Sequence, residues 1–211
     1  MSVSEDREVT PAVQPAASAA SIADPGPLGL AAFALTTFLL SAANAHWMNG
    51  NGTTLAWLGY ALAYGGAAQL LAGMWEFRRG NVFAATAFST YGGFWIGLFL
   101  WFQLVLPTAK SPAAIFHDEA WILLAFAIFN TYMLLMSAQV NLAVFGVFLT
   151  LELTEIVLVI GNFTGGTGGI SQAGGYLGVL TALVAWYTSA AGVSAGIGGK
   201  ILLPVGRPLI S

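Results

Sequence analysis

Polar side chains are set into long apolar stretches of this sequence. They are amides, hydroxyls and one phenol: Asn44, Gln69, Asn162, Thr36, Thr37, Ser41, Ser89, Thr90 and Tyr91. Hydrocarbon cannot satisfy such groups, so they must face protein or a water-filled path. Neutral donors hold a charged or polar solute weakly, and weak binding favours passage over capture. The amides of Gln69 and Asn44 favour a pore lining, whereas each isolated hydroxyl can equally bond its own helix backbone.

Glu152 and Glu155 are the least expected residues, because both lie inside an otherwise apolar stretch. Their i, i+3 spacing places them on one face of a helix, so both can face the protein interior. Two carboxyls this close do not readily ionise together, which makes the pair a candidate proton site beside a pore. The alternative is a neutral carboxyl that hydrogen bonds to a neighbouring helix.

The residues needed for metal binding or covalent chemistry are scarce. Cysteine is absent, which excludes disulfides and thiol catalysis, and the two histidines, His46 and His117, cannot form a histidine-rich metal site. No catalytic constellation and no basic patch for nucleic acid are present. We therefore expect a protein that is not an enzyme and that needs no cofactor or metal.

The composition indicates an integral membrane protein. Of the 211 residues, 57% are hydrophobic and 7% are charged, and the mean hydropathy is +0.79. Soluble domains carry about 25% charged residues, so this chain has too little polar surface to cover a globule in water.

The apolar segments predict six membrane-spanning helices, each near the roughly 20 residues that a bilayer requires. Their expected ranges are 28–48, 54–75, 83–106, 119–138, 141–161 and 174–196. Short connections separate them, among which are the basic turn 78–81, a loop from Pro107 to Asp118 and the glycine-rich run 165–175. His117, Asp118 and Glu119 are expected in the 107–118 loop or at the helix cap that follows it.

Charge placement orients the spans. With the N-terminus inside, the cytoplasmic segments hold five of the six basic residues, and the outer segments hold Lys110: the five are Arg7, Arg78, Arg79, Lys200 and Arg207. The positive-inside rule therefore predicts cytoplasmic termini in a plasma (inner) membrane. The expected organisation is a disordered tail at 1–23, a transmembrane domain at 24–199 and a second tail at 200–211.

Two charged residues near this inner face are interpreted as structural. Asp24 precedes Pro25 and is a favoured helix cap. Glu76, beside Arg78 and Arg79, is expected to form a surface ion pair.

Three motifs resemble the acetate uptake transporter family, the succinate–acetate permease group. They are DPGPLGL at 24–30, TTFLLSAAN at 36–44 and YGGAAQLLAGMWEFRRGNVFAATAFSTYGGFW at 64–95. The last is a nearly complete copy of the family signature, and weaker similarity extends the match over roughly 24–207. Departures are Asp24 and Gly26 in place of the family's Asn and Ala, and the carboxyl pair Glu152 and Glu155.

The resemblance implies six helices around a central pore in each protomer, similar to the urea channels, and a homohexamer. It implies an apolar constriction at Phe33, Tyr91 and Leu151, with Ala185 as a selectivity position. Asn44, Gln69 and Asn162 fall on the family's polar pore positions. The residues themselves add Thr36 and Thr90 as neutral pore donors, and Leu28, near the N-terminus of the first span, as a substrate-contacting position. Glycine pairs such as Gly93 and Gly97, four residues apart, allow helices to approach closely within or between protomers.

The resemblance also implies uptake of acetate and related short carboxylates, including succinate, as a channel or as a proton-coupled symporter. One alternative is a channel for a neutral solute such as urea or ammonia. Another, of a different class, is an acetate sensor that does not transport. Dependence of uptake on a pH gradient would separate the first two interpretations.

Overall fold

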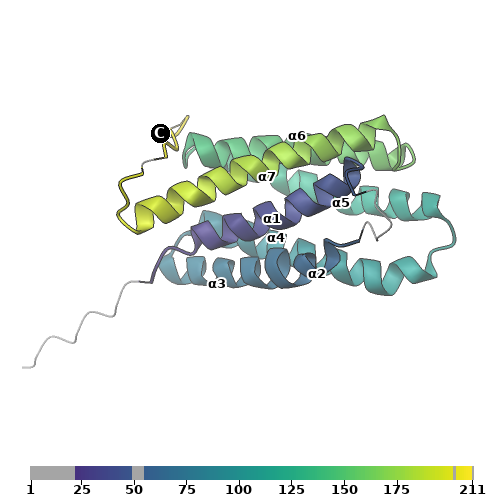
Figure 1. The fold of residues 1–211 in the computed structure, drawn as a ribbon, viewed down its shortest axis with the longest axis horizontal. Coiled ribbons are helices and arrows are strands. Elements are labelled where there is room, and N and C mark those ends of the chain that lie inside the picture. Colours follow the sequence, from purple (N-terminus) through teal and green to yellow (C-terminus); the bar gives the residue numbers. More distant parts are fainter. Residues whose placement is uncertain (1–21, 49–54, 202, 211) are drawn as a thin grey trace, which may run out of the picture.

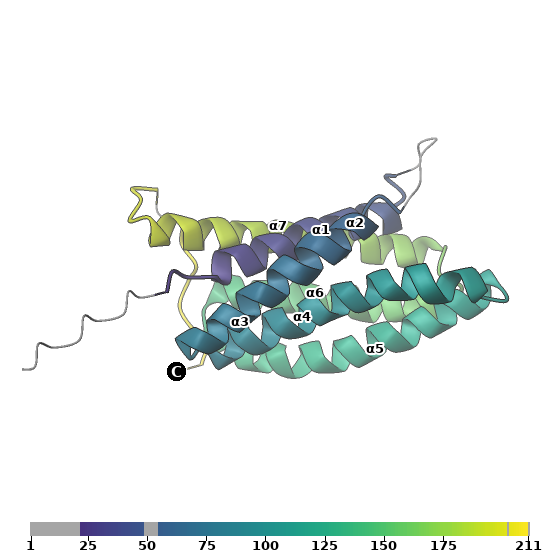
Figure 2. The same cartoon turned by 90° about the horizontal axis from the view of Figure 1, so that it is seen from below.

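A computed structural model describes residues 22–48, 55–201 and 203–210, and these fold into helices that lie side by side along one long axis (Figures 1 and 2). The α-helices are α1 (Gly26–Asn44), α2 (Leu58–Tyr60), α3 (Gln69–Arg79), α4 (Val82–Leu100), α5 (Pro112–Ser137), α6 (Leu142–Phe163) and α7 (Gly169–Gly196). A π-helix, η1 (Ala61–Ala68), joins α2 to α3, and η2 (Trp101–Val105) and η3 (Leu106–Thr108) extend α4. The expected all-helical fold is confirmed.

Side-chain caps fix where several helices begin. Asn81, Ser111 and Asn141 each accept a hydrogen bond from the backbone N–H three residues later, at the starts of α4, α5 and α6. Gly80 ends α3 with φ of 79°, a left-handed conformation that glycine adopts without strain. The basic turn predicted at 78–81 is thus a tight helix–helix connection.

Five helical runs are long and apolar enough to cross a membrane: 26–44, 82–108, 112–137, 142–163 and 169–196. A sixth run, Leu58–Arg79, is continuous but consists of α2, η1 and α3. These crossings make the chain a multi-pass membrane protein.

Two expected connections are shorter than the sequence indicated. Helix α5 starts at Pro112, so His117, Asp118 and Glu119 lie in its first turns; placing them in a loop or at a cap was wrong. Ser111 caps this start and Pro112 suits a first helical position. Likewise α7 begins at Gly169, within the glycine-rich run expected to be a connection.

The helices pack against one another in a ring. Helix α1 lies between α7 on one side and η1 and α3 on the other. Helix α7 also packs on α6, and α6 packs on α5. Helix α3 packs on α4. Small residues let α1 and α7 meet: a Cβ on Gly178 would overlap the Ser41 side chain, and one on Gly175 would overlap the backbone at Asn44. Gly175 and Gly178 therefore serve packing within the chain.

The outer surface is apolar over most of its length. Large hydrophobic side chains are exposed on every long helix, for example Leu71, Val82, Ile128, Leu153 and Leu183. A surface of this kind is unfavourable in water and suits contact with lipid.

The last described residues return to the end of the molecule where α1 begins (Figure 1). Val205 O accepts from Ala143 N at 2.9 Å, and the Tyr187 hydroxyl donates to Pro204 O at 2.7 Å. Both described chain ends therefore lie at one end of the bundle, as an even number of crossings requires.

Candidate functional site

Three cavities follow one another along the bundle. The large cavity, of about 190 Å³, opens beside the start of α1, the end of α3 and the start of α4. Its walls include Asp24, Leu30, Phe33, Gln69, Glu76, Asn81, Phe83, Tyr91, Val144, Phe148 and Leu151. The middle cavity, of about 40 Å³, lies deeper, and the end cavity, of about 50 Å³, lies where α1 ends and α5 and α7 begin.

Phe33, Tyr91 and Leu151 line both the large and the middle cavity, and so form the neck between them. All three are at most 6% exposed and belong to one apolar cluster. The Phe33 and Tyr91 rings meet edge to face, with centroids 5.6 Å apart. The residues expected to form a constriction therefore lie together, on α1, α4 and α6.

The middle and end cavities also share walls. Leu40, Asn44, Phe94, Leu123 and Leu158 line both of them. The cavities thus form a series from the start of α1 to its end, interrupted at the neck. Such a series is what a solute path through a single protomer requires.

The expected polar pore residues divide into two groups. Gln69 lines the large cavity, Asn44 the middle and end cavities, and Asn162 the end cavity. Leu28, Thr36, Thr90 and Ala185 line none of the three cavities. The buried Thr36 hydroxyl donates to Ala32 O at 3.0 Å, the backbone bond that was the alternative for hydroxyls.

Ala185 and Leu28 differ in their surroundings. Ala185 is fully buried in the apolar cluster that contains the neck. Leu28 is 44% exposed near the start of α1. Ala185 can therefore act on the neck through packing, whereas Leu28 lies on the outside of the described chain.

Buried polar atoms without a hydrogen-bond partner gather along these cavities. Within the described residues they are six: Thr37 Oγ1, Gln69 Oε1, Ser89 Oγ, Trp95 Nε1, Glu155 Oε2 and Ser171 Oγ. Five of the six residues line a cavity; the exception is Ser89. An unsatisfied buried polar group costs about 1–3 kcal/mol, so the path offers hydrogen-bonding groups that a polar solute would satisfy.

A hydrogen-bond network ties the neck to the two carboxyls of α6. The Tyr91 hydroxyl lies 2.9 Å from Asn130 Oδ1 and 3.5 Å from Glu155 Oε1. Asn130 Nδ2 donates to Glu152 Oε2 at 2.7 Å and to Phe148 O at 3.0 Å. Glu155 is 5% exposed and lines the middle cavity, whereas Glu152 lines none of the three cavities.

Asn130 is the functional candidate that sequence reasoning missed. It is fully buried on α5 and links the Tyr91 hydroxyl of α4 to Glu152 of α6. The sequence does indicate it, because Asn130 is an amide inside an apolar span. The same pattern led to the selection of Gln69 and Asn44.

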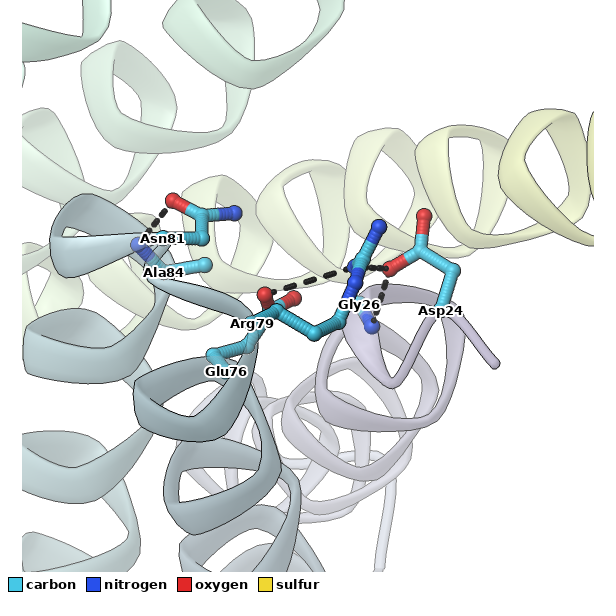
Figure 3. A network of polar contacts seen from close by, with 6 residues as sticks. All are labelled: Asp24, Gly26, Glu76, Arg79, Asn81 and Ala84. Atoms are coloured by element: carbon cyan, nitrogen blue, oxygen red, sulfur yellow. Dashed lines mark hydrogen bonds and ion pairs between the residues drawn. The ribbon is translucent and has the colours of Figure 1, made fainter. Parts of the chain in front are cut away.

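At the mouth of the large cavity, charged groups join the start of α1 to the end of α3 (Figure 3). Asp24 Oδ1 accepts from Gly26 N at 3.0 Å and forms an ion pair with Arg79. Arg79 also pairs with Glu76 Oε2 at 3.4 Å. Glu76 is 1% exposed, so the expectation of a surface ion pair was wrong about its location: this carboxylate is buried against the cavity.

The profile of the GPR1/FUN34/yaaH family matches residues 6–205 of the sequence. The chain belongs to the GPR1/FUN34/yaaH family. This membership confirms the resemblance inferred from the motifs at 24–30, 36–44 and 64–95.

Three of the curated relatives that the chain resembles have names that describe transport. The chain is 38% identical to Acetate permease A of Emericella nidulans over 94% of its own length and 70% of the relative's. It is 32% identical to the Succinate-acetate/proton symporter SatP of Escherichia coli, over 88% and 96%. It is 37% identical to the Ammonia transport outward protein 2 of Saccharomyces cerevisiae, over 82%, and spans only 62% of that protein.

A solved structure of this family has the same fold. The bacterial acetate channel SatP superposes with a TM-score of 0.77 at 30% sequence identity, covering 88% of this chain and 100% of the other. The ring of helices described above is therefore the fold of that channel.

Proposed function

We propose that this membrane protein takes up acetate and related short carboxylates, including succinate, through a path inside each protomer. The observation that carries the proposal is the series of three cavities interrupted by the apolar neck Phe33, Tyr91 and Leu151. The relatives named as an acetate permease and a succinate-acetate symporter, and the acetate channel of the same fold, support this substrate class.

The walls of the path suit transport better than tight binding. Within the described chain, no Lys or Arg lines any of the three cavities, so a bidentate clamp on a carboxylate is lacking. Gln69, Asn44 and Asn162 supply neutral hydrogen-bonding groups instead, and the apolar neck restricts the width and wetting of the path. The transporter and channel names of relatives of the same family and fold support a role other than an enzyme.

We place the chain in the plasma membrane with both termini cytoplasmic, from the distribution of Lys and Arg. The large cavity then faces the cytoplasm, and the end cavity faces outward. Gly93 and Gly97 on α4 have no atoms near their Cβ positions, and this small-residue face supports close packing of copies in a homohexamer.

Radiolabelled acetate uptake into proteoliposomes tests the function. Protein-free liposomes of the same lipid measure the leak of free acetic acid, and an alkaline external buffer keeps that leak small. We expect uptake above this leak that unlabelled acetate and succinate reduce and that urea leaves unchanged. Uptake equal to the leak, together with protein-dependent entry of ammonia or urea, would contradict the proposal in favour of a neutral-solute channel.

A further inference from the structure

The orientation of the Asn130 amide follows from its partners. Its Nδ2 lies 2.7 Å from Glu152 Oε2 and 3.0 Å from Phe148 O, and both of these atoms are acceptors. The two hydrogens of the amide nitrogen are thereby used. Asn130 Oδ1 must then face the Tyr91 hydroxyl at 2.9 Å, and it can only accept.

The Tyr91 hydroxyl has one hydrogen for two neighbouring oxygens. The shorter contact, to Asn130 Oδ1, takes that hydrogen, and the longer one joins Tyr91 to Glu155 Oε1 at 3.5 Å. This longer contact is then a hydrogen bond only if Glu155 carries a proton and donates it. If Glu155 is a carboxylate, Tyr91 can turn its hydrogen away from Asn130 and donate to Glu155 instead. The network therefore accommodates both protonation states of Glu155.

The other oxygen of Glu155 faces the path. Glu155 Oε2 is buried and has no partner among the described residues, and Glu155 lines the middle cavity next to the neck. Thr37 Oγ1 and Trp95 Nε1 line the same cavity and are also without acceptors. Two neutral donors and one carboxyl thus surround the point that a substrate reaches before the neck from the end-cavity side.

The side chains around this point are all acidic or neutral. The titratable neighbours of Tyr91 are Glu152, Glu155 and Tyr132, from α5 and α6. Helix α1 contributes Thr37 and Ser41 to the middle cavity, α4 contributes Trp95, and α5 contributes Leu123. The ion pairs within the described residues involve Arg79 and His117, and neither Glu152 nor Glu155 takes part. A carboxylate substrate and an ionised Glu155 would repel each other here, so one of the two must hold a proton.

We propose that Glu155 carries the proton that accompanies each carboxylate through the neck, an inference that rests on the function proposed above. The substrate carboxylate accepts hydrogen bonds from Thr37 and Trp95, and a proton carried on Glu155 Oε2, the oxygen without a protein partner, moves to it. An O–H bond of Glu155 breaks, an O–H bond forms on the substrate, and Glu155 becomes a carboxylate that Tyr91 stabilises. The neutral acid crosses the apolar neck, and a proton from the end-cavity side restores Glu155. One proton therefore enters with each acetate, without net charge.

Glu155→Gln tests the assignment, because glutamine has nearly the same shape and can donate a hydrogen bond but cannot transfer the proton. The assay is protein-dependent acetate uptake into proteoliposomes, with membrane potentials of either sign set by potassium and valinomycin. Wild-type uptake should be independent of the potential and should rise as the external buffer is acidified at constant acetate anion concentration. Glu155→Gln should lower uptake about tenfold, and the remaining uptake should increase with an inside-positive potential and lose its pH dependence.

Glu152→Gln is the matched control, because Glu152 belongs to the same network but lines none of the three cavities. Its uptake should stay independent of the potential. A Glu155→Gln protein with the wild-type pH profile and no response to the potential overturns the inference, as does a potential response that arises in Glu152→Gln alone. If wild-type protein transports no acetate, the proposed function itself fails, which is a separate outcome.

A second measurement uses unmodified protein, in case the glutamine variant does not fold. Infrared difference spectra with ¹³C-labelled acetate separate the bands of substrate and protein. Adding acetate should decrease the C=O stretching band of a protonated carboxyl and increase the carboxylate bands of the protein. Spectra in which no protonated carboxyl band changes would overturn the proposal.

Discussion

Leu151 contacts both sides of the neck, since it lines the large and the middle cavity. Its side chain is 6% exposed, and it meets the path from α6 while Phe33 meets it from α1. A leucine at such a position limits the width of the path without offering any hydrogen bond to a solute.

Leu151→Ala should widen the neck and admit larger carboxylates such as lactate. The same deletion of buried methyl groups should lower the free energy of unfolding by about 2–5 kcal/mol. Lactate uptake relative to acetate uptake, corrected for the amount of folded protein, measures the effect. Phe33→Ala should act in the same direction, and unchanged selectivity in both variants would remove the neck from the mechanism.

Other residues show why single positions were only partly predictable. Gln69, Asn44 and Asn162 were identified from amides in apolar spans, and they line cavities. Asn130 gives the same signal but lies outside the family motifs that contain Gln69 and Asn44. Nothing in the sequence indicates that Trp95 Nε1 and Thr37 Oγ1 lie in one cavity, because that depends on which helices become neighbours.

At the scale of helices, Arg79 joins α1 to α3. It pairs with Asp24, whose side chain is 47% exposed, and with Glu76, whose side chain is 1% exposed. Surface pairs contribute about 0–1 kcal/mol, whereas removing one partner of a buried pair costs about 3–5 kcal/mol. Loss of the Arg79–Asp24 pair should therefore lower the free energy of unfolding much less than loss of the Arg79–Glu76 pair.

Arg79→Gln should destabilise the protein by a few kcal/mol, because it leaves the buried Glu76 carboxylate without its cation. Asp24→Asn should cost about 1 kcal/mol or less and serves as the matched control. Thermal unfolding midpoints in detergent compare the two variants. Equal midpoints would show that Glu76 is not held by Arg79. The double variant Arg79→Gln with Glu76→Gln should recover much of the loss.

The contact of α1 with α7 needs glycine at position 178. A Cβ there would overlap the Ser41 side chain, whereas Gly93 on α4 has open space around its Cβ position. Gly178→Ala should destabilise the fold by about 1–3 kcal/mol through overpacking, and Gly93→Ala should leave the monomer fold unaffected. Circular dichroism melting curves in detergent provide the comparison, and the opposite ranking would contradict the packing described.

Most helices were predictable because apolar length and capping residues together mark their positions. Asn81 and Gly80 define the turn between α3 and α4 in the sequence as they do in the structure. The start of α5 was missed, because His117, Asp118 and Glu119 were interpreted as a solvated connection although Ser111 and Pro112 are a capping signature. Residues 49–54 lie outside the described chain, so the connection expected between the spans 28–48 and 54–75 is untested.

At the scale of the whole molecule, the apolar exterior must contact lipid or further copies of the chain. The even number of crossings and the position of both described ends follow from the sequence. The order of helices around the ring does not, because residues far apart in the chain, such as Ser41 and Gly178, meet only after folding.

Native mass spectrometry in mild detergent should show six protomers. Gly93 and Gly97 form an open small-residue face on α4, and large side chains there would keep neighbouring helices apart. Gly93→Leu combined with Gly97→Leu should therefore reduce the assembly, and Gly168→Ala, at the start of α7 where an added Cβ meets no atom, is the control for expression. A stable monomer that still transports would contradict the hexamer.

The π-helix η1, Ala61–Ala68, gives the crossing Leu58–Arg79 an irregular segment whose length can change. Hydrogen bonds spaced i to i+5 accommodate an extra residue compared with an α-helix. Deleting the exposed Ala63 should convert this stretch to α-helix and leave Gln69 facing the large cavity. Deleting Leu71 from α3 should instead turn Gln69 by about 100° relative to Arg79 and abolish uptake. A single-residue insertion or deletion at 61–68, where the π-helix contains an extra residue, should therefore leave uptake intact. The same change on either side of 61–68 should abolish uptake.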